Sequence, residues 1–250
     1  MTIETTAKAG DRVFTLPNGI ERKFPAVPPL ENGDRLSRNE FERRYEAMPW
    51  LNKAELIEGV VYMGSPVRSE VHAEPHAAMV TWTGVYRAAT LGVKVADNGT
   101  LRLDADNEPQ PDVMLRIDAR AGGASWLSLS DYVEGAPELV IEVSASSASL
   151  DLGGKRTVYR RNGVREYIVW QIYDRRVDWW ALREGEYQPL LPDDAGVLRS
   201  EVFPGLWLDV PALIADNLAN LLATLQHGLS SDEHTAFVAQ LTTKLSKAEQ

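Results

Sequence analysis

The sequence predicts a mixed α/β (α+β) domain in which helices flank a central sheet. Residues 139–143 are almost continuously apolar, which is typical of a strand buried on both faces. A helix-compatible segment at 149–162 separates them from another apolar segment at 166–172, the order of a strand, helix, strand crossover. Turn sequences, Asp-Asn-Gly at 97–99 and Glu-Gly at 184–185, indicate added hairpins.

Length and composition limit the number of domains and the compartment. The chain has 250 residues, 44% hydrophobic and 25% charged, which suffices for one sizeable core without disorder-like bias. It contains no cysteine, which excludes disulfides and thiolate metal sites and favours a reducing compartment. The first residues lack the apolar stretch of a secretory signal, and no segment approaches the roughly 20 apolar residues of a membrane span. We therefore expect a soluble, cytoplasmic protein.

The N-terminal part is expected to be an arm followed by a helix. Residues 1–34 are rich in turn formers, and the Phe-Pro-Ala-Val-Pro-Pro segment at 24–29 is incompatible with a regular helix or central strand. Ser37 precedes Glu40 by the spacing of a capping box, which predicts a helix that ends near Met48.

Alternating strands and helices are predicted through the middle of the chain. Residues 55–63 indicate one strand, and the helix after it should occupy 75–90, with its proline in the first turn. Segments 93–96 and 100–103 are expected to pair as a hairpin around the Asp-Asn-Gly turn. The alternating apolar residues of 112–117 predict another strand.

The C-terminal part should contain a second hairpin and then helices. Segments 177–182 and 187–191 flank the Glu-Gly turn, and the chain becomes helical from Pro211. Near the end, Phe237, Leu241 and Leu245, together with Val238, form an apolar stripe at helical spacing. This helix should pack on the domain or support self-association, and a homodimer is the expected assembly. The predicted organisation is an arm at 1–34, a domain at 35–210 and a helical extension at 211–250.

Glu142 is the residue that most strongly indicates chemistry. A carboxylate within an apolar strand needs a partner or a cation. Asp112 stands where the preceding apolar strand begins, and Lys155 lies in the helix that follows Glu142. Mg²⁺ or Mn²⁺ prefers oxygen ligands, activates a bound water and polarises a phosphate, while an ammonium stabilises transition-state charge. The sequence therefore predicts a metal site for phosphodiester hydrolysis.

These residues resemble the PD-(D/E)XK nuclease superfamily and, more narrowly, the bacterial Uma-two family of restriction-endonuclease-like proteins. The resemblance covers about residues 35–210 and implies a restriction-endonuclease-like mixed sheet. It implies that Asp112, Glu142 and the carbonyl of Val143 bind the metal and that Lys155 is the catalytic lysine. The motifs that carry it are Glu55-Leu-Ile-Glu-Gly-Val, His72, Pro111-Asp112-Val, Ala136-Pro-Glu-Leu-Val-Ile-Glu-Val-Ser, Asp151, Lys155, Tyr159 and Gly163-Val-Arg-Glu-Tyr-Ile-Val.

The resemblance has one departure, because Ser144 occupies the position where the superfamily usually has its lysine. Lys155 must then reach the site from the next helix, where Asp151 lies four residues earlier on the same face. Glu142 and Lys155 could instead form a structural ion pair, and Asp151 could simply be a favourable charge at a helix N-terminus.

Further side chains are accessory candidates. Glu55 and Glu58 could approach the metal, although the glycine after Glu58 indicates a strand end where acids are solvated. His72 lies near the site by resemblance, where it could contact phosphate or serve a structural role. His72 and His76 do not form a helical zinc pair, because a proline separates them and starts the helix.

The predicted function is a metal-dependent endonuclease that acts on nucleic acid, with DNA as the expected substrate and RNA left open. The formal net charge of −10 weighs against tight nucleic-acid binding, which depends on lysine and arginine neutralising phosphates. It does not exclude the nuclease, since basic residues can gather on one face. A non-catalytic binding or regulatory module with the same fold is the alternative.

Overall fold

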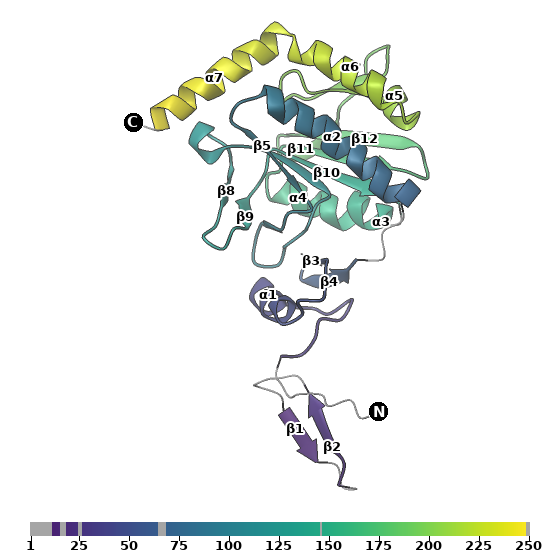
Figure 1. Cartoon of the computed structure of the whole chain (residues 1–250), viewed down its shortest axis with the longest axis vertical. Helices are drawn as coiled ribbons and strands as arrows, with labels where there is room; N and C mark the ends of the chain where they lie inside the picture. The colour runs from purple at the N-terminus through teal and green to yellow at the C-terminus, as the bar shows by residue number, and fades with distance from the viewer. Residues whose placement is uncertain (1–11, 16–18, 25–26, 65–68, 146, 249–250) are drawn as a thin grey trace, which may run out of the picture.

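A mixed sheet of six strands forms the centre of the molecule, and helices cover both of its faces (Figure 1). The computed structural model describes residues 12–15, 19–24, 27–64, 69–145 and 147–248. The strand order is β13-β12-β11-β10-β7-β5, in which β10 and β11 are parallel and the other neighbours antiparallel. The strands are β5 (Val93–Asp97), β7 (Val113–Ile117), β10 (Leu139–Ser144), β11 (Glu166–Gln171), β12 (Arg176–Arg183) and β13 (Glu186–Pro189).

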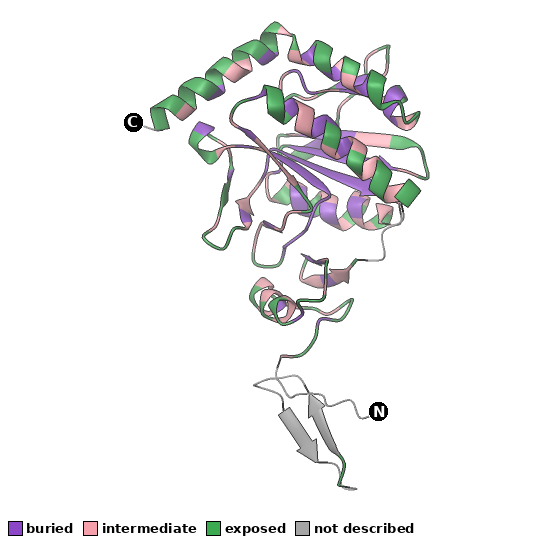
Figure 2. Cartoon of the chain, viewed as in Figure 1, coloured by how far each residue is buried: buried purple, intermediate pink, exposed green. Residues whose placement is uncertain are grey.

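Strand β10 is central, as its apolar sequence predicted. All of its residues are buried, and it lies between β7 and β11 (Figure 2). The predicted crossover to β11 is confirmed, but its helix is not uniform. It consists of α3 (Ala148–Leu150), a π-helical turn η3 (Asp151–Lys155) and α4 (Arg156–Arg161). Gly163 follows at φ 84°, a left-handed conformation that glycine adopts without a Cβ clash.

Alternate strand residues face two different helical layers. Val113 and Ile141 point into the larger core with helices α2 (Glu74–Ala89) and α6 (Leu218–Leu229). Met114 and Val140 point to the opposite core, which α4 covers through Tyr159. Helix α2 confirms the prediction for residues 75–90. Because side chains alternate along a strand, Asp112 and Glu142 belong to the α4 side of the sheet.

Two predictions for the middle of the chain are wrong. Residues 55–63 form a tight hairpin, β3 (Ala54–Ile57) and β4 (Val60–Met63), because Glu58 and Gly59 adopt positive φ angles of 52° and 72°. Segments 93–96 and 100–103 turn at Asn98 but do not pair with each other. Strand β5 pairs with β7, whereas β6 (Leu101–Arg102) joins a small sheet with β9 (Val133–Gly135) and β8 (Ser125–Leu127).

The N-terminal elements lie at one end of the molecule (Figure 1). Helix α1 (Arg38–Glu46) begins after Ser37, as predicted, but Ser37 makes no side-chain capping bond, and Glu40 bonds to arginines of the same helix instead. Within the expected arm, β1 (Arg12–Thr15) and β2 (Glu21–Phe24) form an antiparallel hairpin. Residues 1–11, where a signal sequence would begin, lie outside the described residues. Further short helical turns are η1 (Ser69–Ala73), which leads into α2, and η2 (Ala119–Ala121), which contacts the C-terminal helix.

The C-terminal helices contribute buried side chains to the larger core. Strands β12 and β13 form the predicted second hairpin, and β14 (Val197–Arg199) pairs with β15 (Trp207–Asp209) before α5 (Val210–Ile214). Helix α7 (Asp232–Ala248) buries Leu241 in the larger core, and Phe237 and Leu245 pack beside it. In the described residues, no helix is both long and apolar enough to cross a membrane.

Candidate active site

Asp112 and Glu142 face each other across two neighbouring strands. The register of β7 and β10 pairs Val113 with Ile141, so one further step places Asp112 opposite Glu142. Opposed residues of antiparallel strands point to the same face. Both carboxylates are almost fully buried, on the side that α4 covers. The pair predicted from sequence is therefore brought together.

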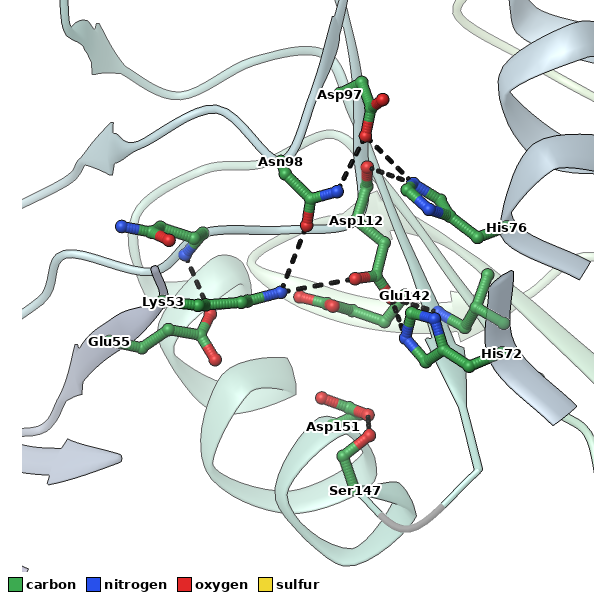
Figure 3. A network of polar contacts seen from close by, with 12 residues as sticks. Lys53, Glu55, His72, His76, Asp97, Asn98, Asp112, Glu142, Ser147 and Asp151 are labelled. Atoms are coloured by element: carbon green, nitrogen blue, oxygen red, sulfur yellow. Dashed lines mark hydrogen bonds and ion pairs between the residues drawn. The ribbon is translucent and has the colours of Figure 1, made fainter. Parts of the chain in front are cut away.

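Asp112 lies between donors from three segments (Figure 3). Its Oδ2 accepts a hydrogen bond of 2.8 Å from the backbone N–H of Val143 and lies 3.6 Å from His72 Nε2. Its Oδ1 lies 3.3 Å from Lys53 Nζ. Burial alone would raise the pKa of Asp112, but the close contact with His72, the charge of Lys53 and the Val143 N–H together hold this pKa well below its usual range.

Lys155 is enclosed by carboxylates. Its Nζ lies 2.9 Å from Glu55 Oε1, 3.1 Å from Glu142 Oε1 and 3.4 Å from Asp151 Oδ1. The π-helical turn brings Lys155 and Asp151 to the sheet together, and both are buried. Tyr159 donates a 2.9 Å hydrogen bond to the same Oε1 of Glu142. Burial raises the pKa of Glu142, and the neighbouring carboxylates raise it further. The positive charge of Lys155 lowers this pKa but does not cancel the rise.

Ser144 has a supporting role at the position where a lysine was expected. Its hydroxyl donates to Asp151 Oδ2 at 2.5 Å, and Ser147 donates to the same oxygen at 2.6 Å. Asp151 in turn contacts Lys155, so Ser144 helps to hold the acid that pairs with the relocated lysine. Asp151 is thus more than a charge at a helix end.

The accessory candidates divide into two groups. Glu55 and Asp151 join the cluster through Lys155, and His72 joins it through Asp112. Glu58 does not, because it occupies the β3–β4 turn, where its side chain is 48% exposed and pairs with Arg161 at 2.9 Å. His76 contacts the carbonyl of Asp112 at 3.0 Å and the carboxylate of Asp97 at 3.1 Å rather than sharing a ligand with His72.

Lys53 is a residue of the site that was not predicted from the sequence. It directly precedes β3, and its Nζ reaches Asp112 Oδ1 and, at 3.4 Å, Asn98 Oδ1. A signal was present, because Lys53 stands two residues before Glu55 and side chains two apart on an extended chain share a side. The backbone pairing of Leu56 with Glu108 then brings this segment next to the start of β7.

The cluster suits a hard divalent cation by its donors and its charge. Four carboxyl groups, those of Glu55, Asp112, Glu142 and Asp151, face two ammonium groups. Both contacts to Glu142 reach Oε1, which leaves Oε2 without a hydrogen bond among the described residues. Asp151 Oδ1 is likewise buried without a hydrogen-bond donor. These are the oxygen ligands that Mg²⁺ and Mn²⁺ prefer, although no three acidic or histidine side chains of the described residues already form a closed metal cage.

Comparisons with known proteins agree with this architecture. A family model described as "Uma2: Putative restriction endonuclease" matches residues 38–211. Among solved structures, a protein from Anabaena variabilis ATCC 29413, described as a putative nuclease belonging to DUF820, is similar with a TM-score of 0.50. The two chains are 13% identical, and the similarity covers 73% of this chain and 97% of the other, so it supports the fold alone. None of the curated proteins matches significantly.

Proposed function

The chain belongs to the Uma2 family, and from this premise we propose that it is a metal-dependent endonuclease that hydrolyses phosphodiester bonds, with DNA as its substrate. The observation that carries the proposal is the pair of buried, opposed carboxylates of Asp112 and Glu142 beside two lysines. If the cluster served only to stabilise the fold through ion pairs, each carboxylate would be expected to have its own cation. Here four carboxyl groups face two lysines.

Asp112, Glu142 and the carbonyl of Val143 are the groups that would hold Mg²⁺ or Mn²⁺. When bound, such an ion activates water and neutralises charge on the phosphate. Around it, the backbone N–H of Val143 fixes Asp112, and Tyr159 fixes Glu142. Lys155 holds the carboxylates of Glu55, Glu142 and Asp151 close together through ion pairs. Its positive charge beside Glu142 can stabilise the negative charge that develops on the phosphate.

A non-catalytic nuclease-fold module remains the second candidate, and the surroundings of Lys155 favour it. The ammonium of Lys155 forms ion pairs with three carboxylates, which compensate its charge without any substrate. In such a module, Lys155 would stabilise the fold and take no part in catalysis. The net charge of −10 also favours a protein that binds nucleic acid weakly.

A cleavage assay separates these functions. The protein is incubated with a mixture of duplex DNA, single-stranded DNA and RNA, either with Mg²⁺ or Mn²⁺ or with EDTA. The proposal predicts cleavage that requires the metal, and the relative loss of DNA and RNA identifies the substrate. Intact nucleic acid under all metal conditions would favour the non-catalytic module.

Metal binding gives an independent test of the ligands. We expect calorimetric titration to detect Mn²⁺ binding by the wild type and a large loss of affinity in Asp112→Asn and in Glu142→Gln. The ion should also raise the melting temperature, because it relieves repulsion between the buried acids and binds only the folded state. Equal binding by all three proteins would place the ion elsewhere.

A further inference from the structure

We propose that Lys53 is a second catalytic lysine of this site, which neutralises Asp112 until the divalent cation binds and then contacts the phosphate of the scissile diester. The inference rests on the proposed function. It starts from the position of Lys53, whose Nζ lies 3.3 Å from Asp112 Oδ1 and 3.4 Å from Asn98 Oδ1 (Figure 3). Both distances are at the long end for a hydrogen bond.

The two lysines of the site differ in their freedom to move. Lys155 is 4% exposed and contacts three carboxylates. Lys53 is 31% exposed and contacts one carboxylate and one amide oxygen, so at least one of its three N–H donors has no described acceptor. A substrate phosphate has to approach from the solvent side. Lys53 is therefore the ammonium that can meet it with the smaller rearrangement.

Lys53 and a divalent cation would compete for the same carboxylate. Asp112 is a proposed metal ligand, and Lys53 is the cation that lies against its Oδ1. A divalent ion at Asp112 would repel the nearby ammonium, and the four-carbon stem of lysine allows the head group to swing away. Because Lys53 is partly exposed, the displaced ammonium would stay on the solvent side of Asp112. There it could pair with a negatively charged phosphate in place of the carboxylate.

In the hydrolysis, Lys53 acts through its charge and keeps its proton. The water oxygen forms a bond to phosphorus, and the bond from phosphorus to one ester oxygen breaks, with its electron pair remaining on that oxygen. The water loses a proton to solvent, and the leaving oxygen gains one from solvent. An ammonium beside the non-bridging oxygens stabilises the charge that builds up on them in the transition state.

Mn²⁺ affinity, measured by calorimetry, tests the exchange at Asp112. Lys53→Met removes the competing cation, so we expect it to bind Mn²⁺ about two- to fivefold more tightly than the wild type, the range for a partly exposed ion pair. Lys53→Arg keeps the charge and should bind nearly as the wild type does. Lys94→Met is the matched control, because Lys94 is 44% exposed and lies 3.9 Å from Asp118, outside the site. The change in Mn²⁺ affinity of Lys94→Met measures the effect of losing one positive charge anywhere on the protein, and this effect is subtracted from that of Lys53→Met.

Single-turnover cleavage at saturating Mn²⁺ tests the phosphate contact. Lys53→Met should cleave on the order of 10²-fold more slowly despite its tighter metal binding, and Lys94→Met should cleave at the wild-type rate. Tighter binding with an unreduced rate would overturn the phosphate contact. A reduced rate with unchanged Mn²⁺ affinity would overturn the exchange. If the wild type binds Mn²⁺ and cleaves, and Lys53→Met has the same affinity and the same rate, only the role of Lys53 is refuted. A wild type that binds no Mn²⁺ would overturn the proposed function as well.

Discussion

The ammonium of Lys155 holds together acids from three parts of the chain: Glu55 from β3, Glu142 from β10 and Asp151 from the π-helical turn. Each of these carboxylates is buried, so each depends on a nearby positive charge or on a proton. Such an arrangement can stabilise the fold and is also compatible with the proposed catalysis. The two interpretations of Lys155, ion-pair partner and catalytic lysine, are therefore compatible and can be measured separately.

Lys155→Met should be destabilised in the absence of metal by about 3–5 kcal/mol, because it leaves buried acids without their cation. Mg²⁺ or Mn²⁺ should restore part of this loss. The folded fraction should retain metal but cleave about 10²- to 10³-fold more slowly if Lys155 is catalytic. Urea denaturation and single-turnover kinetics provide the two readouts, with Lys94→Met as the control. Full cleavage by folded Lys155→Met would assign Lys155 to structure alone.

Glu166 carries a separate pH dependence at the start of β11. Burial raises the pKa of Glu166 to about 7, against hydrogen bonds from Ser200 and from the backbone of Glu201 and Val202. The folded state therefore favours the protonated carboxyl group of Glu166. The contribution of this group to stability is complete below its pKa in the unfolded chain, near 4.5, and is lost as the pH rises through about 7. The loss amounts to about 3 kcal/mol.

We therefore expect Glu166→Gln to reduce the fall in unfolding free energy between pH 5 and pH 8. The amide keeps an acceptor for the two backbone N–H groups and needs no proton. Urea denaturation across this range is the measurement, and Glu186→Gln is the control, since Glu186 is exposed and pairs only with Arg160 among the described contacts. An unchanged pH profile for Glu166→Gln would show that Glu166 is already ionised at pH 5.

At the level of elements, the π-helical turn η3 and helix α7 each bring residues that are distant in sequence together. The turn η3 widens the helix by one residue just where Asp151 and Lys155 face the sheet. Helix α7 covers the end of the larger core through Leu241, whose side chain lies beside Gly92. A side chain added at Gly92 would meet Leu241 and Leu245 at 3.4 and 3.3 Å, which indicates close packing there.

Leu241→Ala should lower the free energy of unfolding by about 2–5 kcal/mol, because it removes a fully buried leucine and leaves a cavity. Leu129→Ala is the matched control, since Leu129 is fully exposed and its truncation should change stability by less than about 0.5 kcal/mol. Thermal and urea denaturation of both variants give the comparison. Equal stabilities would mean that α7 is detached in solution, and light scattering would then show whether it mediates self-association instead.

Elements whose structure is determined by neighbouring residues could be predicted from the sequence, and those that depend on distant residues could not. Strand β10 and the crossover could be predicted because apolar continuity is a property of neighbouring residues. The β5–β6 hairpin could not be excluded, because the turn at Asn98 does form. What decides the pairing is β7, which continues the ladder with a hydrogen bond from the Asn98 N–H to the carbonyl of Asp112. The strand propensities of residues 93–103 carry no information about this distant pairing partner.

The candidate site was partly predictable for the same reason. Glu142 was identified by its local conflict with an apolar strand, and Asp112 and Lys155 were identified by their positions around it. Their roles as metal ligand and catalytic lysine came from the resemblance. The spacing of Lys53 and Glu55 indicated only that they share a side of the chain. It could not place Lys53 at Asp112, because that approach depends on the bridge between Leu56 and Glu108, far apart in the chain. Glu58 lies apart from Glu55 because residues 55–63, which were predicted as one strand, turn back at Glu58 and Gly59.

Across the whole molecule, the net charge of −10 and the buried acids make the divalent cation central to the proposed function. Without the ion, repulsion should keep phosphates away from the site. The most direct measurement is the single-turnover cleavage of DNA with and without Mn²⁺ by the wild type, Asp112→Asn and Glu142→Gln, with Glu186→Gln as an exposed control. We expect metal-dependent cleavage by the wild type and the control, and a loss of at least about 10²-fold in both site variants. Cleavage by folded Asp112→Asn and Glu142→Gln at the wild-type rate would contradict the proposed function.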